Sequence, residues 1–171
     1  ADGYRWWIDR FRASAALYDI IRIDHFRGFE GYYAIPGGAA TAREGVWRQG
    51  PGIELFHAVR AALGELPIIA EDLGFLTEGV HRLREECGFP GMKVLQFAFD
   101  SREDSDYLPH NYPRHCVVYT GTHDNDTILG WLSTAAPQDA RFAWEYLRLT
   151  EAEGANWGMM CGALQSPGDT V

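Results

Sequence analysis

The sequence lacks several features that would each assign it to a particular class of protein. No apolar run approaches the roughly 20 residues of a membrane-spanning helix, and the charged residues near the start do not form a secretory signal peptide. Basic residues number 15 against 24 acidic ones, which gives a net charge of -9. This charge disfavours nucleic acid and anionic membrane surfaces as partners. We therefore expect a globular protein that binds no nucleic acid and no membrane.

Cysteine is also scarce. The residues Cys87, Cys116 and Cys161 are scattered, and none forms a Cys-x-x-Cys pair. The pattern therefore predicts neither a disulfide framework nor a zinc site. Reduced, buried thiols in a cytoplasmic protein are the expectation. No predicted strand runs into a Gly-x-Gly-x-x-Gly turn, and no cofactor is indicated.

Short apolar runs that fit strands alternate with segments of helical spacing. This order predicts an α/β protein built from parallel strand–helix–strand units. A (β/α)8 barrel and an open doubly wound sheet both fit the alternation. The residues after the first strand, 28–45, are expected to form a long aromatic, glycine-rich loop. Strands are predicted at about 19–24, 66–70, 92–100 and 115–120, and helices at about 4–17, 53–63, 78–87, 127–133, 138–152 and 157–165.

The four predicted strands make up about half of a barrel, because a whole (β/α)8 barrel needs about 250 residues. The chain starts at Ala1 inside a helical pattern and stops in a polar segment at Val171. We therefore expect residues 1–171 to form one partial catalytic barrel domain, truncated at both ends. Alone, such a piece would leave strand edges unpaired. We expect it to be weakly stable or inactive by itself.

One stretch, residues 20–29, combines strand character with charge. Its apolar residues surround Arg22 and Asp24, which are two positions apart, so both side chains point to the same side of an extended strand. A charged pair on the core face of a strand is costly unless both members are paired. Such pairs tie strands together and also occur at active sites. Both interpretations are open at this point.

Three acidic residues, Asp24, Glu71 and Asp124, each follow a separate predicted strand. If the strands are parallel and share one sheet, the three side chains collect at one rim. Glycoside chemistry needs such a set: a nucleophile or base, a proton donor, and room for an oxocarbenium-like transition state. A metal site is the main alternative for an acidic cluster. It is disfavoured because Arg22 places positive charge beside Asp24.

Other residues give weaker signals. His123 precedes Asp124, and a histidine beside an aspartate is by itself more often structural than functional. Four aromatic residues are of the type that stacks on sugar rings, although each fits a core equally well: Tyr32, Tyr33, Trp47 and Tyr119.

Three motifs together resemble a known family. They are Arg22-Ile-Asp-His-Phe-Arg-Gly-Phe29, Ala70-Glu-Asp-Leu-Gly74 and Tyr119-Thr-Gly-Thr-His-Asp-Asn-Asp-Thr127. In this order they resemble amylomaltase, the bacterial 4-α-glucanotransferase, known in plants as disproportionating enzyme. That family belongs to the α-amylase clan of retaining (β/α)8 enzymes. The resemblance covers nearly the whole chain. It implies that the four strands correspond to strands four to seven of a (β/α)8 TIM barrel.

The resemblance implies a role for each matching residue. Asp24 corresponds to the nucleophile, and Arg22 to the partner that keeps it ionised and oriented. Glu71 corresponds to the general acid/base. Asp124 corresponds to the acid that grips the sugar hydroxyls in the transition state, and His123 to a neighbour that binds the donor sugar. No metal and no cofactor are implied.

The implied activity is a retaining 4-α-glucanotransferase. It would move α-1,4-glucan segments between maltooligosaccharides or starch, as donor and acceptor, through a covalent glycosyl-enzyme on Asp24. A hydrolytic α-amylase or α-glucosidase of the same clan is one alternative, because its catalytic trio would be the same. A non-catalytic glucan-binding fragment is another. Retention predicts carboxyl groups of Asp24 and Glu71 about 5–5.5 Å apart.

Overall fold

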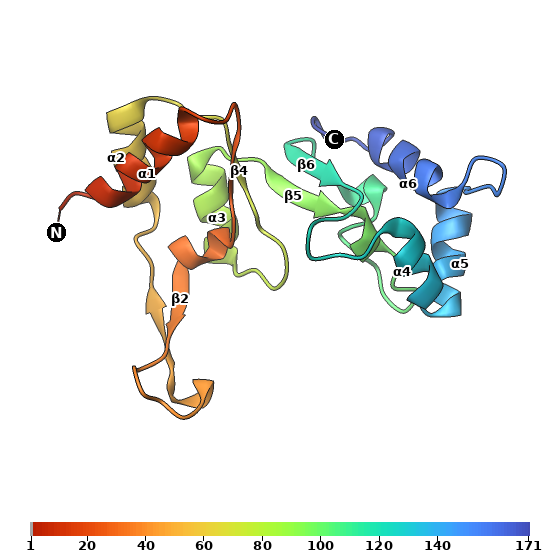
Figure 1. The fold of residues 1–171 in the computed structure, drawn as a ribbon, viewed down its shortest axis with the longest axis horizontal. Helices are drawn as coiled ribbons and strands as arrows, with labels where there is room; N and C mark the ends of the chain where they lie inside the picture. Colours follow the sequence, from red (N-terminus) through yellow and green to blue (C-terminus); the bar gives the residue numbers. More distant parts are fainter. Residues whose placement is uncertain (1) are drawn as a thin grey trace. The chain divides into compact units, whose positions relative to one another are not determined.

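The computed structural model describes residues 2–171 and shows a mixed α/β chain with small sheets. The chain divides into two compact units, one ending at Gly91 and the other running from Met92 to Val171. Each unit has its own hydrophobic core. The two units are therefore described one at a time, with element labels as in Figure 1.

The first unit is organised around two short parallel strands. β1 pairs with β4 in a register that joins Ile21 to Ile68 and Ile23 to Ala70. Between them the chain forms an antiparallel hairpin of β2 and β3, and then a helix. The elements in chain order are α1 (Arg5–Ala15), β1 (Ile21–Ile23), β2 (Gly31–Ala34), β3 (Val46–Gln49), α2 (Ile53–Leu63), β4 (Ile68–Ala70) and α3 (Glu78–Cys87).

The core of this unit is rich in phenylalanine. Phe26, three residues after the end of β1, is fully buried, and its ring centroid lies 5.6 Å from that of Phe56 on α2. Phe89, which follows α3, packs edge-on against Phe56 at 5.4 Å. Burying large aromatic rings is strongly favourable. The packing of the Phe26 side chain in the core therefore holds the turn after β1 in place.

Two helices of this unit have the bounds that the sequence predicts, 53–63 and 78–87. A capping threonine and a terminating glycine bound α3. The Thr77 hydroxyl accepts a hydrogen bond from the Val80 N–H, at 3.4 Å. Gly88 ends the helix in the left-handed conformation, with φ 72°.

In the second unit, β5 (Gly91–Val94), which begins at the boundary, pairs with β6 (Cys116–Tyr119). Three helices follow, and Met159 on the last of them is fully buried beside Leu95 and Val118 in one core. These helices are α4 (Ile128–Thr134), α5 (Pro137–Tyr146) and α6 (Ala155–Leu164).

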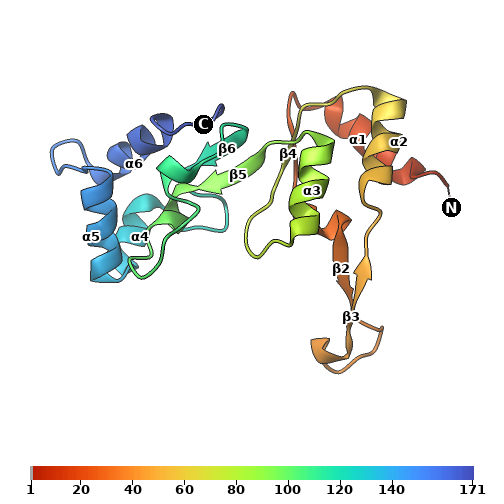
Figure 2. The same cartoon turned by 180° about the vertical axis from the view of Figure 1, so that it is seen from behind.

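The structure corrects the prediction of a loop at residues 28–45. This stretch contains β2, which forms the hairpin with β3, and in Figures 1 and 2 the hairpin extends away from α1, α2 and α3. Tyr33 lies opposite Trp47 in the register, and their rings meet edge-on at 5.4 Å. Such cross-strand aromatic pairs stabilise a sheet. The glycines and prolines nearby favour a loop, so the sequence pattern did not predict these strands.

The other corrections concern strands and one helix end. The described residues form three two-stranded sheets, of which the pair of β1 and β4 has the expected parallel direction. The strand expected at 92–100 stops at Val94, where a 3-10 helix, Leu95–Ala98, takes over. The helix expected at 138–152 ends at Tyr146. A run of apolar residues shows burial, and by itself it does not separate a strand from a buried turn of helix.

Candidate functional site

The Arg22–Asp24 pair forms as the alternation predicts. Arg22 Nη1 lies 2.8 Å from Asp24 Oδ1. The pair is not on the core face, however, because the Asp24 side chain is 70% exposed. The reason is the length of β1: it ends at Ile23, so Asp24 already belongs to the turn. The Arg22 guanidinium, which is mostly covered, thus holds an exposed carboxylate at the end of a strand.

Glu71 leaves β4 beside Asp24. Ile23 and Ala70 are register partners on neighbouring parallel strands, and Asp24 and Glu71 each come one residue later. The Glu71 N–H donates to the Ile23 carbonyl at 2.9 Å, and the Phe26 N–H donates to the Glu71 carbonyl at 3.0 Å. The backbone therefore places the two acids at the same level, at the carboxyl ends of two adjacent strands.

Backbone amides also hold the Glu71 carboxylate. Its Oε2 accepts a hydrogen bond from the His25 N–H at 2.6 Å, and its Oε1 accepts one from the Leu73 N–H at 2.8 Å. His25 adopts φ 50° and ψ 50°, the left-handed region, which costs a residue with a side chain about 1–2 kcal/mol. A half-buried carboxylate fixed by two amides keeps one orientation.

His123 and Asp124 follow β6 in the second unit. His123 Nε2 lies 3.4 Å from Asp124 Oδ2, and the Asp124 side chain is 80% exposed. Asn125 shapes this turn, because its Oδ1 accepts from both the N–H and the hydroxyl of Thr122, at 2.8 and 2.9 Å. The buried Gln96 side chain donates to the Asp126 carbonyl at 2.9 Å. The exposed pair therefore stands on a turn fixed by side-chain amides.

The structure thus groups the predicted residues in two sets. Arg22, Asp24 and Glu71 come together in the first unit, and His123 and Asp124 come together in the second.

Comparisons with known proteins identify the family. Residues 1–171 match the model of the 4-alpha-glucanotransferase family. The chain belongs to this family. It is 49% identical over 168 residues to the 4-alpha-glucanotransferase of Clostridium butyricum, with 98% of this chain and 34% of the relative covered. With the Streptococcus pneumoniae enzyme of the same name it shares 62% identity over 130 residues, covering 76% of this chain and 26% of that enzyme.

A solved structure of an amylomaltase supports the same family assignment. The amylomaltase from Streptococcus agalactiae in complex with acarbose superimposes with a TM-score of 0.92 at 39% identity, covering 98% of this chain and 34% of that one. This chain therefore spans between 26% and 34% of the length of these family members.

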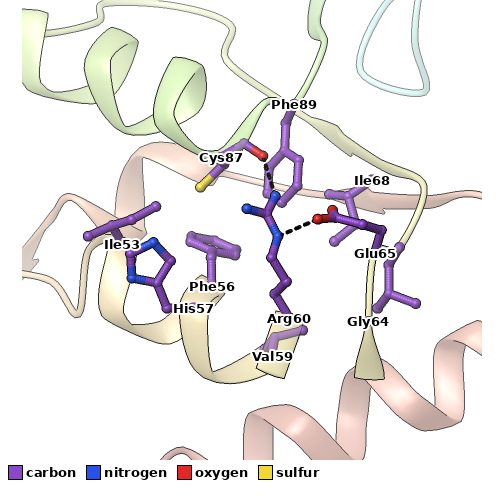
Figure 3. Close-up of a pocket in the computed structure, with 11 residues that line it drawn as sticks. Ile53, Phe56, His57, Val59, Arg60, Gly64, Glu65, Ile68, Cys87 and Phe89 are labelled. Carbon is purple, nitrogen blue, oxygen red and sulfur yellow. Dashed lines mark hydrogen bonds and ion pairs between the residues drawn. The ribbon is translucent and has the colours of Figure 1, made fainter. Parts of the chain in front are cut away.

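A small pocket of the first unit lies away from the predicted site residues, none of which lines it. Figure 3 shows it between α2 and the segments around β4 and α3. Arg60 crosses it, pairing with Glu65 at 2.8 Å and donating to the Cys87 carbonyl at 3.3 Å. The cavity volume is about 20 Å³, room for about one water. No sugar ring fits there.

The pocket wall contains the Cys87 thiol. Burial raises the pKa of this thiol from 9.0 to about 12, because a low-dielectric environment disfavours the thiolate. Cys87 is therefore a protonated, inert side chain near neutral pH.

Two features are absent from residues 2–171. None of the described helices is long and apolar enough to cross a membrane. Within the same range, no three His, Cys, Asp or Glu side chains gather in a way that could hold a metal ion.

Sequence reasoning missed the backbone part of the site. It assigned no role to His25 or Leu73, whose amides hold Glu71, nor to Asn125, which fixes the turn before Asp126. Only Asn125 carried a signal, since asparagine commonly closes such turns. Backbone donors leave no trace in the sequence.

Proposed function

We propose that this chain carries the catalytic residues of a retaining 4-α-glucanotransferase. The observation that supports it is the register of β1 and β4, which brings Asp24 and Glu71 to the same level on adjacent strands. Neighbouring strands are about 4.8 Å apart. This spacing suits the separation of about 5–5.5 Å between the two carboxyl groups of a retaining enzyme.

The proposed reaction is a double displacement. Glu71 donates a proton to the glycosidic oxygen while Asp24 attacks the anomeric carbon, so that the bond to the leaving glucan breaks and an ester to Asp24 forms. Glu71, now a carboxylate, takes the proton from the 4-hydroxyl of an acceptor glucan. The acceptor oxygen attacks the anomeric carbon and releases Asp24, and the α-linkage is restored.

The other predicted residues have supporting roles in this proposal. Arg22, 2.8 Å from Asp24, keeps the nucleophile ionised and oriented. Asp124 and His123 bind hydroxyls of the donor sugar. The substrates are α-1,4-glucans, with maltooligosaccharides or starch as donor and acceptor. Exposed aromatic residues are candidates for stacking on glucose rings: Tyr32, Tyr33 and Trp47.

The proposal includes the surrounding fold and the location. The strands β1, β4, β5 and β6 would be strands four to seven of a (β/α)8 barrel, with the remaining strands supplied by the complete protein. The similarity to the amylomaltase from Streptococcus agalactiae supports this placement. A cytoplasmic location stays a prediction.

The test uses the complete protein that contains this sequence, incubated with maltotriose. Glucose together with a ladder of longer maltooligosaccharides is the expected product pattern. Glucose and maltose alone would instead identify a hydrolase. The 171-residue chain by itself is expected to give no ladder.

Glu71→Gln separates catalysis from binding. It keeps the shape of the side chain and removes the proton donor, so turnover is expected to fall by at least about 100-fold while glucan binding persists. Glu78→Gln is a matched control, because the Glu78 side chain is 91% exposed on α3. Full activity in Glu71→Gln would contradict the assignment of the acid/base.

A further inference from the structure

We propose that His25 is a positioning residue for Glu71, acting through its backbone N–H and not through its imidazole. This inference rests on the proposed function, in which Glu71 is the general acid/base. Its basis is a single short contact: the His25 N–H donates to Glu71 Oε2 at 2.6 Å across 46 residues of sequence.

The contact belongs to a run of backbone links between the two strand ends. The Ile23 carbonyl accepts from the Glu71 N–H, and the Phe26 N–H donates to the Glu71 carbonyl. The His25 N–H lies between these two links in the chain and binds the Glu71 side chain. The segment that carries the nucleophile thus also orients the acid/base.

The left-handed conformation of His25 makes this arrangement possible. With φ 50° and ψ 50°, the chain turns sharply after Asp24, and the next residue, Phe26, enters the core with no exposed surface. A residue in this region must tolerate a positive φ. Glycine does so without cost, asparagine and histidine do so more readily than most residues, and a β-branched residue does so poorly.

The requirement at position 25 is therefore conformational. A side chain that resists positive φ would rotate the amide away from Glu71 and leave the carboxylate on the Leu73 N–H alone, 2.8 Å from its Oε1. A catalytic group displaced by about 1 Å can lose about 100-fold in rate. The imidazole is exposed and takes no part in this argument.

The test compares two donors in the complete protein. Maltotriose needs its glycosidic oxygen protonated by Glu71. α-Maltosyl fluoride does not, because its C–F bond breaks with fluoride leaving unprotonated as the ester to Asp24 forms. A misplaced acid therefore slows the first donor selectively, and kcat/KM for fluoride release reports only the formation of that ester.

Four substitutions at His25 and one control complete the design. His25→Val is expected to lower kcat/KM for maltotriose by at least about tenfold and that for α-maltosyl fluoride by less than about threefold. His25→Asn and His25→Gly are expected to stay within about threefold of the wild type on both donors. His81→Val, on the exposed surface of α3, is expected to change neither. His25→Ala gives a milder version of the same selective loss if His25→Val does not fold.

Several outcomes overturn the inference. Equal losses on both donors in His25→Val or His25→Ala would mean general damage or a displaced Asp24. No loss on either donor would mean that the contact is dispensable. Losses in His25→Asn and His25→Gly as large as in His25→Val would assign the effect to the imidazole. A wild-type protein that uses neither donor would refute the proposed function itself, and the inference with it.

Discussion

The Asp72 carboxylate lies 3.2 Å from the Nε of Arg84, and the two side chains are only 11% and 14% exposed. Asp72 directly follows Glu71, and Arg84 lies on α3 and also donates to the Phe89 carbonyl at 3.3 Å. The residue after the proposed acid/base is thus tied to the helix behind it. These contacts make Asp72 part of the scaffold behind Glu71.

Breaking this pair is expected to destabilise the protein. Asp72→Asn leaves the Arg84 guanidinium largely buried without its counter-charge, so the free energy of unfolding should fall by about 3 kcal/mol. Chemical denaturation of the wild type and the variant measures the difference. The double variant Asp72→Asn/Arg84→Met should cost less than the two single changes together, because it leaves no unpaired charge.

An exposed pair on the same helix serves as the control. Arg82 lies 3.8 Å from Glu78, with side chains 67% and 91% exposed. Removing that pair with Glu78→Gln should cost less than about 1 kcal/mol. Equal costs for the two pairs would show that burial of Asp72 and Arg84 does not matter.

Gly50 is expected to tolerate no side chain. A Cβ atom there would overlap the carbonyl group of Phe29 and approach the Gly28 carbonyl oxygen to 2.9 Å. These are backbone atoms, which cannot move aside as a side-chain tip can. Gly50→Ala should therefore lower the free energy of unfolding by about 2 kcal/mol or more.

The matched control is Gly37→Ala, because nothing lies within 4 Å of a Cβ at that position. That change should leave the free energy of unfolding within about 0.5 kcal/mol of the wild type. Thermal or chemical unfolding of both variants decides the matter, and similar values for the two would contradict the close approach at Gly50.

Stability is expected to fall at alkaline pH because of Cys87. Its pKa is raised by burial from 9.0 to about 12 in the folded protein. Below pH 9 the thiol is protonated in both states, so it contributes no pH dependence. Between pH 9 and pH 12 the unfolded chain loses the proton that the folded chain retains. The free energy of unfolding therefore falls as the pH rises through this range.

Chemical denaturation at pH 7 and pH 10.5 measures this effect. The stability change between the two pH values should be smaller by about 2 kcal/mol in Cys87→Ala than in the wild type. Comparing changes with pH removes the cost of the cavity that alanine leaves at either pH. The same pH dependence in both proteins would show that the thiol ionises in the folded state.

The parts of the fold that follow from local chemistry could be predicted from the sequence. α2 and α3 have the predicted bounds because a proline or a threonine marks their starts and a glycine follows their ends. Strand centres at 21–23, 68–70 and 116–119 were found from apolar runs. The hairpin of β2 and β3 was not predicted because it depends on contacts between residues far apart in the sequence, such as Tyr33 and Trp47.

The candidate site likewise has parts that the sequence predicts and parts that it does not. The acids were found because carboxyl groups after apolar strands stand out in a sequence. The hydrogen bond from the His25 N–H to Glu71 could not be found, because every residue except proline has this donor. The left-handed conformation of His25 directs this N–H toward Glu71. The exposure of Asp24 was also missed, since it depends on β1 ending one residue earlier than the apolar pattern indicated.

The hairpin of β2 and β3 begins and ends at almost the same point. The Gly50 N–H donates to the Glu30 carbonyl at 2.8 Å, and the Gly52 N–H donates to the Phe29 carbonyl at the same distance. The segment between Glu30 and Gly50 is thus a protruding hairpin whose two ends are joined by hydrogen bonds. A change in the length of this hairpin would therefore leave the path of the chain from Asp24 to α2 unchanged. The length and the side chains of the hairpin can therefore change in evolution while β1 and β4 keep their register.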